Sequence, residues 1–413
     1  MGKKKIRVDN EVLTLDPSID VSGYEFVGGI DVHKEKCAIF IVYAKHGEVP
    51  HDAEVFADYI NRSYRRVKSN AEGFEKLLGD LSKAKKVSFL MENSTKSHEI
   101  YWMLTSIGIE TYVAHSTDLF RITKSTRKND DRDARELAYY LRRKLYGEVE
   151  FALCYMPDAK QMERKQLCRF LANLKEDLSV LKKQARMRLL ITGKHTSREY
   201  SDISYVSARR ELLAMKDNVL AFIVKRMEQT IELIKFSEKV ILNEFSDDRT
   251  FQIIYSIPGF GIHSAAYITS EIMDISRFPN KQRFSGYFGV RPKQDDSADS
   301  QNNRPISRRG DALARRLCYQ ATFVHMSHVE ESNITQKYQR LRARGKVHKE
   351  STMACTNSMF MMIYTMVKHD TSYTCNKELL KKCREKADAM DINDLSEIDD
   401  PDTSSCEQEM AVA

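Results

Sequence analysis

The chain has 413 residues, of which 42% are hydrophobic and 30% charged, and its mean hydropathy is −0.50. This length suggests two or three domains, and no stretch approaches the roughly 18 to 20 apolar residues that a membrane span needs. The basic start, MGKKKIRVDN, is not followed by an apolar core, which argues against a signal peptide. We therefore expect a cytoplasmic protein that has no membrane partner.

Positive charge dominates the body of the chain. The formal net charge is +7, but residues 387–413 hold nine acidic residues and no Lys or Arg, so the remainder carries 66 basic against 50 acidic residues, a net +16. Such a body commonly has a polyanionic partner; the alternative is a solvated surface of uneven charge. Residues 371–413 are predicted to form a C-terminal tail, acidic and disordered from about residue 387.

The eight cysteines are scattered through the chain and form no C-x-x-C pair. This pattern is typical of reduced thiols and argues against a zinc site.

The N-terminal part predicts an α/β domain. Residues 1–23 are interpreted as a flexible leader and residues 24–150 as the domain itself. Apolar runs predict strands at 26–32, 37–43, 86–91 and 110–114, with Ala53 to Ala57 as a candidate further strand, and helices at 72–81, 99–107 and 131–145. Three strands followed by alternating helices and strands imply a mixed sheet with helices on its faces, which is the element order of an RNase H-like domain.

The rest of the chain is predicted to be helical. In residues 151–248, two apolar seams of heptad type run from Leu167 to Ala185 and from Leu220 to Phe245, with a break at 192–194. Two long helices folded back on each other, or paired with another protomer, would bury these seams. The region is either a helical spacer or a dimerisation arm. Residues 249–370 are expected to form a mainly helical C-terminal domain, with helices at 263–273, 311–329 and 351–367.

Four carboxylates stand where a site is expected. Asp31 and Glu92 end two predicted strands, and Asp130 and Asp133 share one face at the start of the helix that follows. Asp131 competes with Asp130, since it is shifted by one position. Carboxylates that converge repel one another unless cations bind. Mg²⁺ takes hard oxygen ligands, with Mn²⁺ as a substitute, and two such ions can serve phosphodiester displacement.

Several short motifs then resemble one family, the insertion-sequence family 110 transposases. They occur in the family's order, at residues 29–34 (GIDVHK), 91–93 (MEN), 128–134 (KNDDRDA), 257–261 (IPGFG), 287–292 (YFGVRP) and 306–310 (ISRRG). The resemblance covers roughly residues 24 to 370. It implies a RuvC-like N-terminal domain with a catalytic, metal-binding carboxylate set, which here is Asp31, Glu92, Asp130 and Asp133.

The resemblance also implies a serine nucleophile in the C-terminal domain. Counted from Pro292, the matching residue is Ser297, although Ala298 stands where the family has glycine. Ser300 is the nearby rival, and Ser307 is a weaker candidate. A serine hydroxyl needs a base or a metal to become a good nucleophile, and no His lies close to Ser297 in sequence, which favours metal assistance.

The family further implies three partners: double-stranded DNA (element ends and target), a structured guide RNA, and other copies of the chain in a dimer or tetramer. Basic clusters would neutralise phosphates, and the turn before residue 262 suits a phosphate at a helix N-terminus. The predicted nucleic-acid contacts are Arg65, Arg66, Lys128, Gly259, Gly261, Arg304, Arg308, Arg309, Arg315 and Arg316.

The sequence thus predicts a DNA transposase that cleaves and rejoins the ends of an insertion element. Two alternatives remain: a RuvC-like endonuclease or junction resolvase that cuts without rejoining, and an inactive, nucleic-acid-binding remnant of a transposase.

Overall fold

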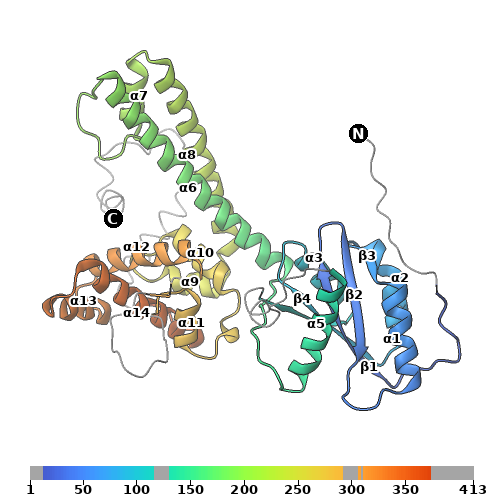
Figure 1. The fold of residues 1–413 in the computed structure, drawn as a ribbon. Coiled ribbons are helices and arrows are strands. Elements are labelled where there is room, and N and C mark those ends of the chain that lie inside the picture. Colours follow the sequence, from blue (N-terminus) through green and yellow to red (C-terminus); the bar gives the residue numbers. More distant parts are fainter. Residues whose placement is uncertain (1–12, 116–129, 292–305, 308–309, 374–413) are drawn as a thin grey trace. The chain divides into compact units, whose positions relative to one another are not determined.

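The computed structural model describes residues 13–115, 130–291, 306–307 and 310–373; of Asp130 it describes only the backbone. The chain divides into two compact units, residues 1–158 and 159–413 (Figure 1). Each unit is described by itself below. The boundaries predicted at residues 150 and 248 stay predictions.

The first unit is built on a five-stranded mixed sheet with the order β3-β2-β1-β4-β5. β1 pairs antiparallel with β2 and parallel with β4, while β3 and β5 extend the two sides. The strands are β1 (Glu25–Val32), β2 (Lys36–Tyr43), β3 (Arg66–Lys68), β4 (Lys86–Glu92) and β5 (Glu110–Ala114). The helices are α1 (His51–Ser63), α2 (Ala71–Leu81), α3 (Ser97–Ser106) and α5 (Asp130–Leu145).

Helices cover both faces of this sheet (Figure 1). On one face, alternate residues such as Phe26, Ile30 and Phe89 pack with buried residues of α1, α2 and α3. On the other face, Val27 and Leu90 pack with Leu137 and Leu141 of α5. The near-continuous burial of β1 and β4 follows from this double cover. The predicted mixed sheet with helices on its faces is confirmed.

A close approach of backbone to backbone fixes α5 on the sheet. A Cβ atom at Gly29 would lie 2.0 Å from the carbonyl oxygen of Ala134 and 2.6 Å from the Cβ of Leu137. Only glycine leaves room for the helix at this point of β1. The absence of a side chain at Gly29 thereby sets how closely the start of α5 approaches the end of β1.

The candidate strand at Ala53 to Ala57 was wrong, because these residues belong to α1. The buried residues of α1 are Ala53, Phe56 and Ile60, at spacings of three and four, which is helical periodicity. Five residues are too few to distinguish the two periods. The sheet's third strand along the chain is β3, which begins at Arg66 in a basic stretch and has only Val67 buried.

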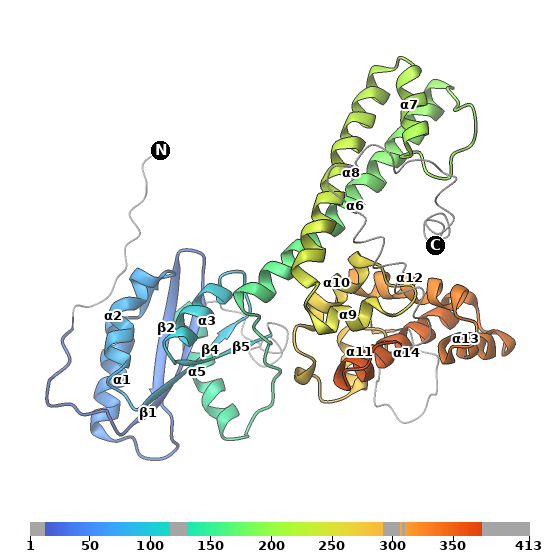
Figure 2. The same ribbon diagram turned by 180° about the vertical axis from the view of Figure 1, so that it is seen from behind.

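The second unit contains the two long predicted helices and a group of shorter ones. Its helices are α6 (Ala159–Thr192), α7 (Val206–Ala214), α8 (Asn218–Phe245), α9 (Arg249–Tyr255), α10 (Ile262–Ile272), α11 (Lys281–Tyr287), α12 (Ala312–His328), α13 (Asn333–Ala343) and α14 (His348–Lys368), with a 3-10 turn at Ile275–Arg277. Figure 2 shows α6 and α8 side by side, with α7 near their far end. The seams are buried between helices of one chain, as Leu181 and Val224 illustrate. A role of this arm in dimerisation stays a prediction.

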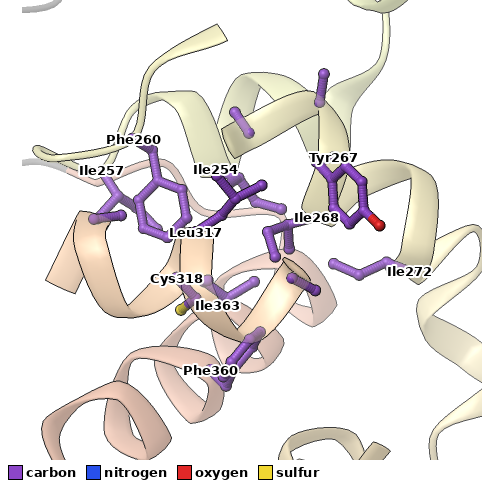
Figure 3. Close-up of a cluster of buried hydrophobic side chains, with 14 of the residues drawn as sticks. Ile254, Ile257, Phe260, Tyr267, Ile268, Ile272, Leu317, Cys318, Phe360 and Ile363 are labelled. Atoms are coloured by element: carbon purple, nitrogen blue, oxygen red, sulfur yellow. The ribbon is translucent and has the colours of Figure 1, made fainter. Parts of the chain in front are cut away.

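The shorter helices share one large core with the first half of α6. Ile254, Phe260 and Ile268 meet Leu317 of α12 and Ile363 of α14 in this core (Figure 3). α10 is its centre, since every residue from Ser264 to Ile272 is buried. None of the described helices has the length and apolarity to cross a bilayer. The five cysteines among the described residues are all free thiols, as the sequence predicts.

A buried ionic network ties α6 to α10 and α12. Glu271, only 1% exposed, accepts from Lys165 at 2.9 Å and Arg169 at 3.1 Å, and Arg169 also lies 3.5 Å from Asp311. Tyr267 donates its hydroxyl to Asp311 at 2.9 Å, and Asp311 caps the N-terminus of α12. A buried carboxylate with two cationic partners is costly to leave half-paired.

Gly29→Val is expected to destabilise the first unit by about 3 kcal/mol or more, because the added side chain must displace α5 backbone. The single tryptophan, Trp102, lies in this unit, so its fluorescence during urea unfolding of the full chain is the measurement. Gly79→Ala is the matched control: a Cβ atom at Gly79 in α2 would meet no atom from outside its own helix turn within 4 Å, and alanine there should leave stability unchanged or raise it by up to about 1 kcal/mol. Equal effects of both substitutions would contradict the packing argument.

Glu271→Gln is expected to cost the second unit on the order of 3 kcal/mol, because two cations lose their buried counter-charge. Helical circular dichroism during urea unfolding reports mainly on this unit, which holds most of the described helical residues, while the urea transition seen by Trp102 fluorescence should stay unchanged. Glu176→Gln removes the same charge from a surface pair, with Arg316 at 3.4 Å, and should alter stability by only about 0.5 kcal/mol. A comparable loss in both variants would show that the network contributes no more than a surface pair.

Candidate carboxylate site

Two of the predicted acidic residues end neighbouring parallel strands. Ile30 of β1 pairs with Met91 of β4, so Asp31 and Glu92 each stand one residue beyond that pair. They occupy equivalent places at the carboxyl end of the sheet, and strand alternation puts both on the face that α5 covers. The side chain of Asp31 is 17% exposed, whereas Glu92 is exposed.

The first turn of α5 lies toward this end of the sheet. Val27 packs with Leu137 and Leu141, and Gly29 lies against Ala134 and Leu137. Moving forward along β1 therefore means moving backward along α5. Asp31, two residues after Gly29 on the same face, is directed toward the helix start that holds Asp130 and Asp133. The positive end of the helix dipole at this start favours negative charge.

The structure separates Asp131 from the other acids of this turn. Its carboxylate accepts from Arg65, whose Nε lies 3.0 Å away, and Nε of Arg66 lies 3.5 Å from its other oxygen. Asp131 also holds the pKa of Arg65 above its ordinary value. Two guanidinium groups thus already balance this charge, which argues against Asp131 as a member of the carboxylate set.

A histidine that the sequence analysis gave no role lies beside Asp31. Nε2 of His33 is 3.1 Å from Oδ2 of Asp31. The backbone of His33 is fixed on both sides: its N–H donates to the carbonyl of Lys36 at 3.1 Å, and Ser69 donates its hydroxyl to the His33 carbonyl at 2.7 Å. The only sequence signal for this contact is the position of His33, two residues after Asp31.

The donor set fits a hard divalent cation in its chemistry, because Asp31, Glu92 and Asp133 offer carboxylate oxygens. Within the described part of the chain, no three His, Cys, Asp or Glu side chains already form a group that could hold a metal ion. The side chain of Asp130 and residues 116–129, which lead into α5, lie outside the described residues. The expectation that the four carboxylates converge therefore rests on the strand register and on the packing of α5.

The predicted nucleophile Ser297 and its rival Ser300 lie outside the described residues, but both ends of their segment are described. The N–H of Ser307 donates to the carbonyl of Arg291 at 2.8 Å, so the chain returns beside the point where it left. Next to this closure, a Cβ atom at Gly310 would lie 2.1 Å from the carbonyl oxygen of Tyr287. The described residues on both sides of the segment thus lie close together and against the second unit.

The predicted phosphate turn has a packing role of its own. Gly259 has a φ of +99°, and a Cβ atom there would lie 2.3 Å from the carbonyl oxygen of Ala321 in α12. The N–H of Gly261 donates to Ser264 at 3.0 Å. The pKa of the neighbouring His263 is lowered to about 3, mainly by burial and in addition by the positive charges of Lys175 and Arg316. The start of α10 is therefore electropositive, and phosphate binding at Gly259 and Gly261 stays a prediction.

The predicted basic contacts differ in the partners that their side chains already have within the chain. Arg65 and Arg66 face Asp131, and Arg315 donates to the carbonyl of Phe288 at 2.9 Å. Arg316 is half-exposed and pairs at 3.4 Å with the exposed Glu176. A weak surface pair of this kind can be exchanged for a phosphate at small cost. The remaining predicted contacts lie outside the described residues; they are Lys128, Arg304, Arg308 and Arg309.

Comparison with known families gives two matches that together cover more than half of the chain. Residues 28–193 match the model described as a transposase of the DEDD type of IS110, and residues 251–339 match the model described as the transposase IS116/IS110/IS902 family. The first match covers the sheet, α5 and α6, and the second covers α9 to α13.

Individual relatives agree with these matches. The insertion element IS900 uncharacterized 42 kDa protein of Mycobacterium paratuberculosis is 28% identical over 156 residues, which are 38% of this chain and 39% of that protein. The transposase for insertion sequence element IS1328 of Yersinia enterocolitica is 30% identical over 99 residues, 24% of this chain and 30% of that protein. The putative transposase y4qE of Sinorhizobium fredii is 22% identical over 361 residues, 79% of this chain and 84% of that protein.

The chain spans less than two fifths of the length of the first two of these relatives, and most of the third. The two matches lie one after the other along the chain, and both models describe transposases of the same family. The chain belongs to the IS110 family of transposases.

Proposed function

We propose that this chain is a transposase that cleaves and rejoins double-stranded DNA of an insertion element, with an RNase H-like carboxylate centre in its first unit and a serine nucleophile in its second. The observation that carries the proposal is the meeting of two strand ends and a helix start at one edge of the sheet. Asp31 and Glu92 come from the strands, and Asp133 with Asp130 comes from the helix. The family membership of both units supports the same reading.

Asp31, Glu92, Asp130 and Asp133 would hold divalent ions, most simply Mg²⁺ with Mn²⁺ as a substitute, because their donors are carboxylate oxygens. Bound there, such ions supply positive charge for the attacking and leaving oxygens of a phosphodiester displacement. The chain's own contribution is positional. Gly29 admits α5 close to β1, so that its first turn reaches the strand ends. Arg65 and Arg66 hold Asp131 to the side.

The serine step would occur at Ser297. Its hydroxyl oxygen forms a bond to a DNA phosphorus while the bond to a sugar oxygen breaks; the hydroxyl proton passes to a base or to water, and the departing sugar oxygen takes up a proton to become a hydroxyl. Rejoining reverses this exchange, with a sugar hydroxyl displacing the serine. Ser297 itself lies outside the described residues, between Arg291 and Ser307, which are joined by a backbone hydrogen bond.

The proposed partners follow from charge and family. DNA phosphates would meet the basic body of the chain, in which Arg316 beside the start of α10 is a described example. Selection of target and donor DNA by a structured guide RNA, and assembly into a dimer or tetramer, are part of the proposal. Recovery and sequencing of nucleic acid that co-purifies with the chain tests the RNA partner: one discrete structured RNA supports it, and random fragments speak against it.

Asp31→Asn and Glu92→Gln are each expected to lower strand cleavage about a thousand-fold, since losing a metal ligand removes several kcal/mol of transition-state stabilisation. Nucleic-acid binding, measured by gel shift on DNA spanning the element ends, should change by no more than about threefold because these residues do not neutralise phosphates. Asp131→Asn is the matched control and should retain cleavage, since its carboxylate serves Arg65 and Arg66. Undiminished cleavage in Asp31→Asn and Glu92→Gln would remove the carboxylate centre from the proposal.

Ser297→Ala is expected to abolish a covalent protein–DNA adduct, detected as labelled DNA that stays with the chain on a denaturing gel. Ser300→Ala, three residues away, should keep the adduct. An adduct that survives Ser297→Ala and disappears in Ser300→Ala would move the nucleophile to the rival position. Cleavage without any adduct in the unsubstituted protein would favour an endonuclease that cuts but does not rejoin.

A further inference from the structure

The contact between His33 and Asp31 has the dimensions of a metal-ligand pair. Protein donors bind octahedral ions at about 2.0 to 2.2 Å, so two neighbouring donors of one ion lie about 2.8 to 3.1 Å apart. Nε2 of His33 and Oδ2 of Asp31 are 3.1 Å apart. A single ion could therefore contact both atoms after little movement of either side chain.

The turn between β1 and β2 holds His33 in place without its side chain. The N–H and carbonyl of His33 are both hydrogen-bonded, to Lys36 and to the buried Ser69. Its imidazole is about half exposed, so it packs in no core. Such an arrangement presents the ring to the carboxyl end of the sheet at a low cost in conformational entropy.

Resting on the proposed function, we propose that His33 is an additional ligand of the ion held by Asp31, and that this nitrogen donor shifts the site's preference from Mg²⁺ toward first-row transition ions. Mg²⁺ selects oxygen ligands and gains little from an imidazole. Transition ions bind imidazole readily, and their affinity for nitrogen sites rises from Mn²⁺ toward Cu²⁺. Mn²⁺, at the weak end of that series, is a stringent probe.

The experiment loads the full-length protein with Mn²⁺ alone and records electron spin-echo envelope modulation. A nitrogen bonded to the ion modulates the echo, and the expected result is a ¹⁴N signal that becomes a ¹⁵N signal when histidine is isotopically labelled. His33→Ala should lose the signal while Mn²⁺ remains bound through the carboxylates. In calorimetric titrations, the Mn²⁺ dissociation constant should rise at least about tenfold, the loss that even outer-shell partners of a metal produce, and that of Mg²⁺ by no more than about threefold.

His46→Ala is the matched control. His46 also pairs with a carboxylate, Glu148 at 2.8 Å, and is similarly exposed, but it contacts Tyr146, just beyond the C-terminal end of α5. This variant should keep both the nitrogen signal and the Mn²⁺ affinity. Because His33 and His46 are both exposed, neither substitution removes core packing.

The outcomes separate this inference from the proposed function. If Mn²⁺ binds, and Asp31→Asn abolishes the binding, but the unsubstituted protein gives no ¹⁴N signal, then His33 is only an ion-pair partner of Asp31 and the carboxylate centre stands. A nitrogen signal that persists in His33→Ala also overturns the inference. If the unsubstituted protein binds no Mn²⁺, both the inference and the metal-dependent function fall.

Discussion

The contact between Gly29 of β1 and the backbone of α5 determines the geometry of the candidate site. Asp31 and Glu92 lie together at the carboxyl end of the sheet because β1 and β4 are parallel neighbours, which is a property of the sheet alone. The helix acids are different, because they reach that edge only if α5 lies close and in one register. Gly29 permits this approach, and Ala134, Leu137 and Ala138 occupy the space that a side chain would fill. The site thus depends on the absence of a Cβ atom at Gly29.

Two aspartates near the site, Asp131 in the first turn of α5 and Asp31 near the end of β1, have different partners. Arg65, just before β3, and Arg66, its first residue, compensate Asp131, whereas Nε2 of His33 lies 3.1 Å from Asp31. Arginine remains charged at any relevant pH and cannot act as a metal ligand, whereas a neutral imidazole can. Asp131 and Asp31 therefore have different chemistry available to them, although both lie near the candidate site.

Much of the first unit could be predicted from its sequence because its strands are apolar and short. The strand at Glu110–Ala114 and the helix starting near Asp130 agree closely with the predicted ranges. α13 (Asn333–Ala343) was not predicted, because only Ile334 and Thr335 are buried and no apolar period marks it. The order of the acids could be found along the chain, but the choice against Asp131 could not. That choice depends on Arg65 and Arg66, which are distant from Asp131 in the sequence and come near it only in the fold.

The two halves of α6 belong to different hydrophobic clusters. Cys168, Leu171 and Leu174 are part of the core that holds the C-terminal helices, while Leu181 and Ala185 pack with α7 and α8. With 34 residues, the helix is about 50 Å long. Its first half is held among the C-terminal helices, and its second half extends beyond them to α7 and α8. About 18 residues, or about 27 Å, of the helix lie beyond Leu174, so a tilt of about 5° there moves the tip by about 2 Å. A partner bound near the C-terminal end of α6 could thus act on the C-terminal helices through one continuous helix.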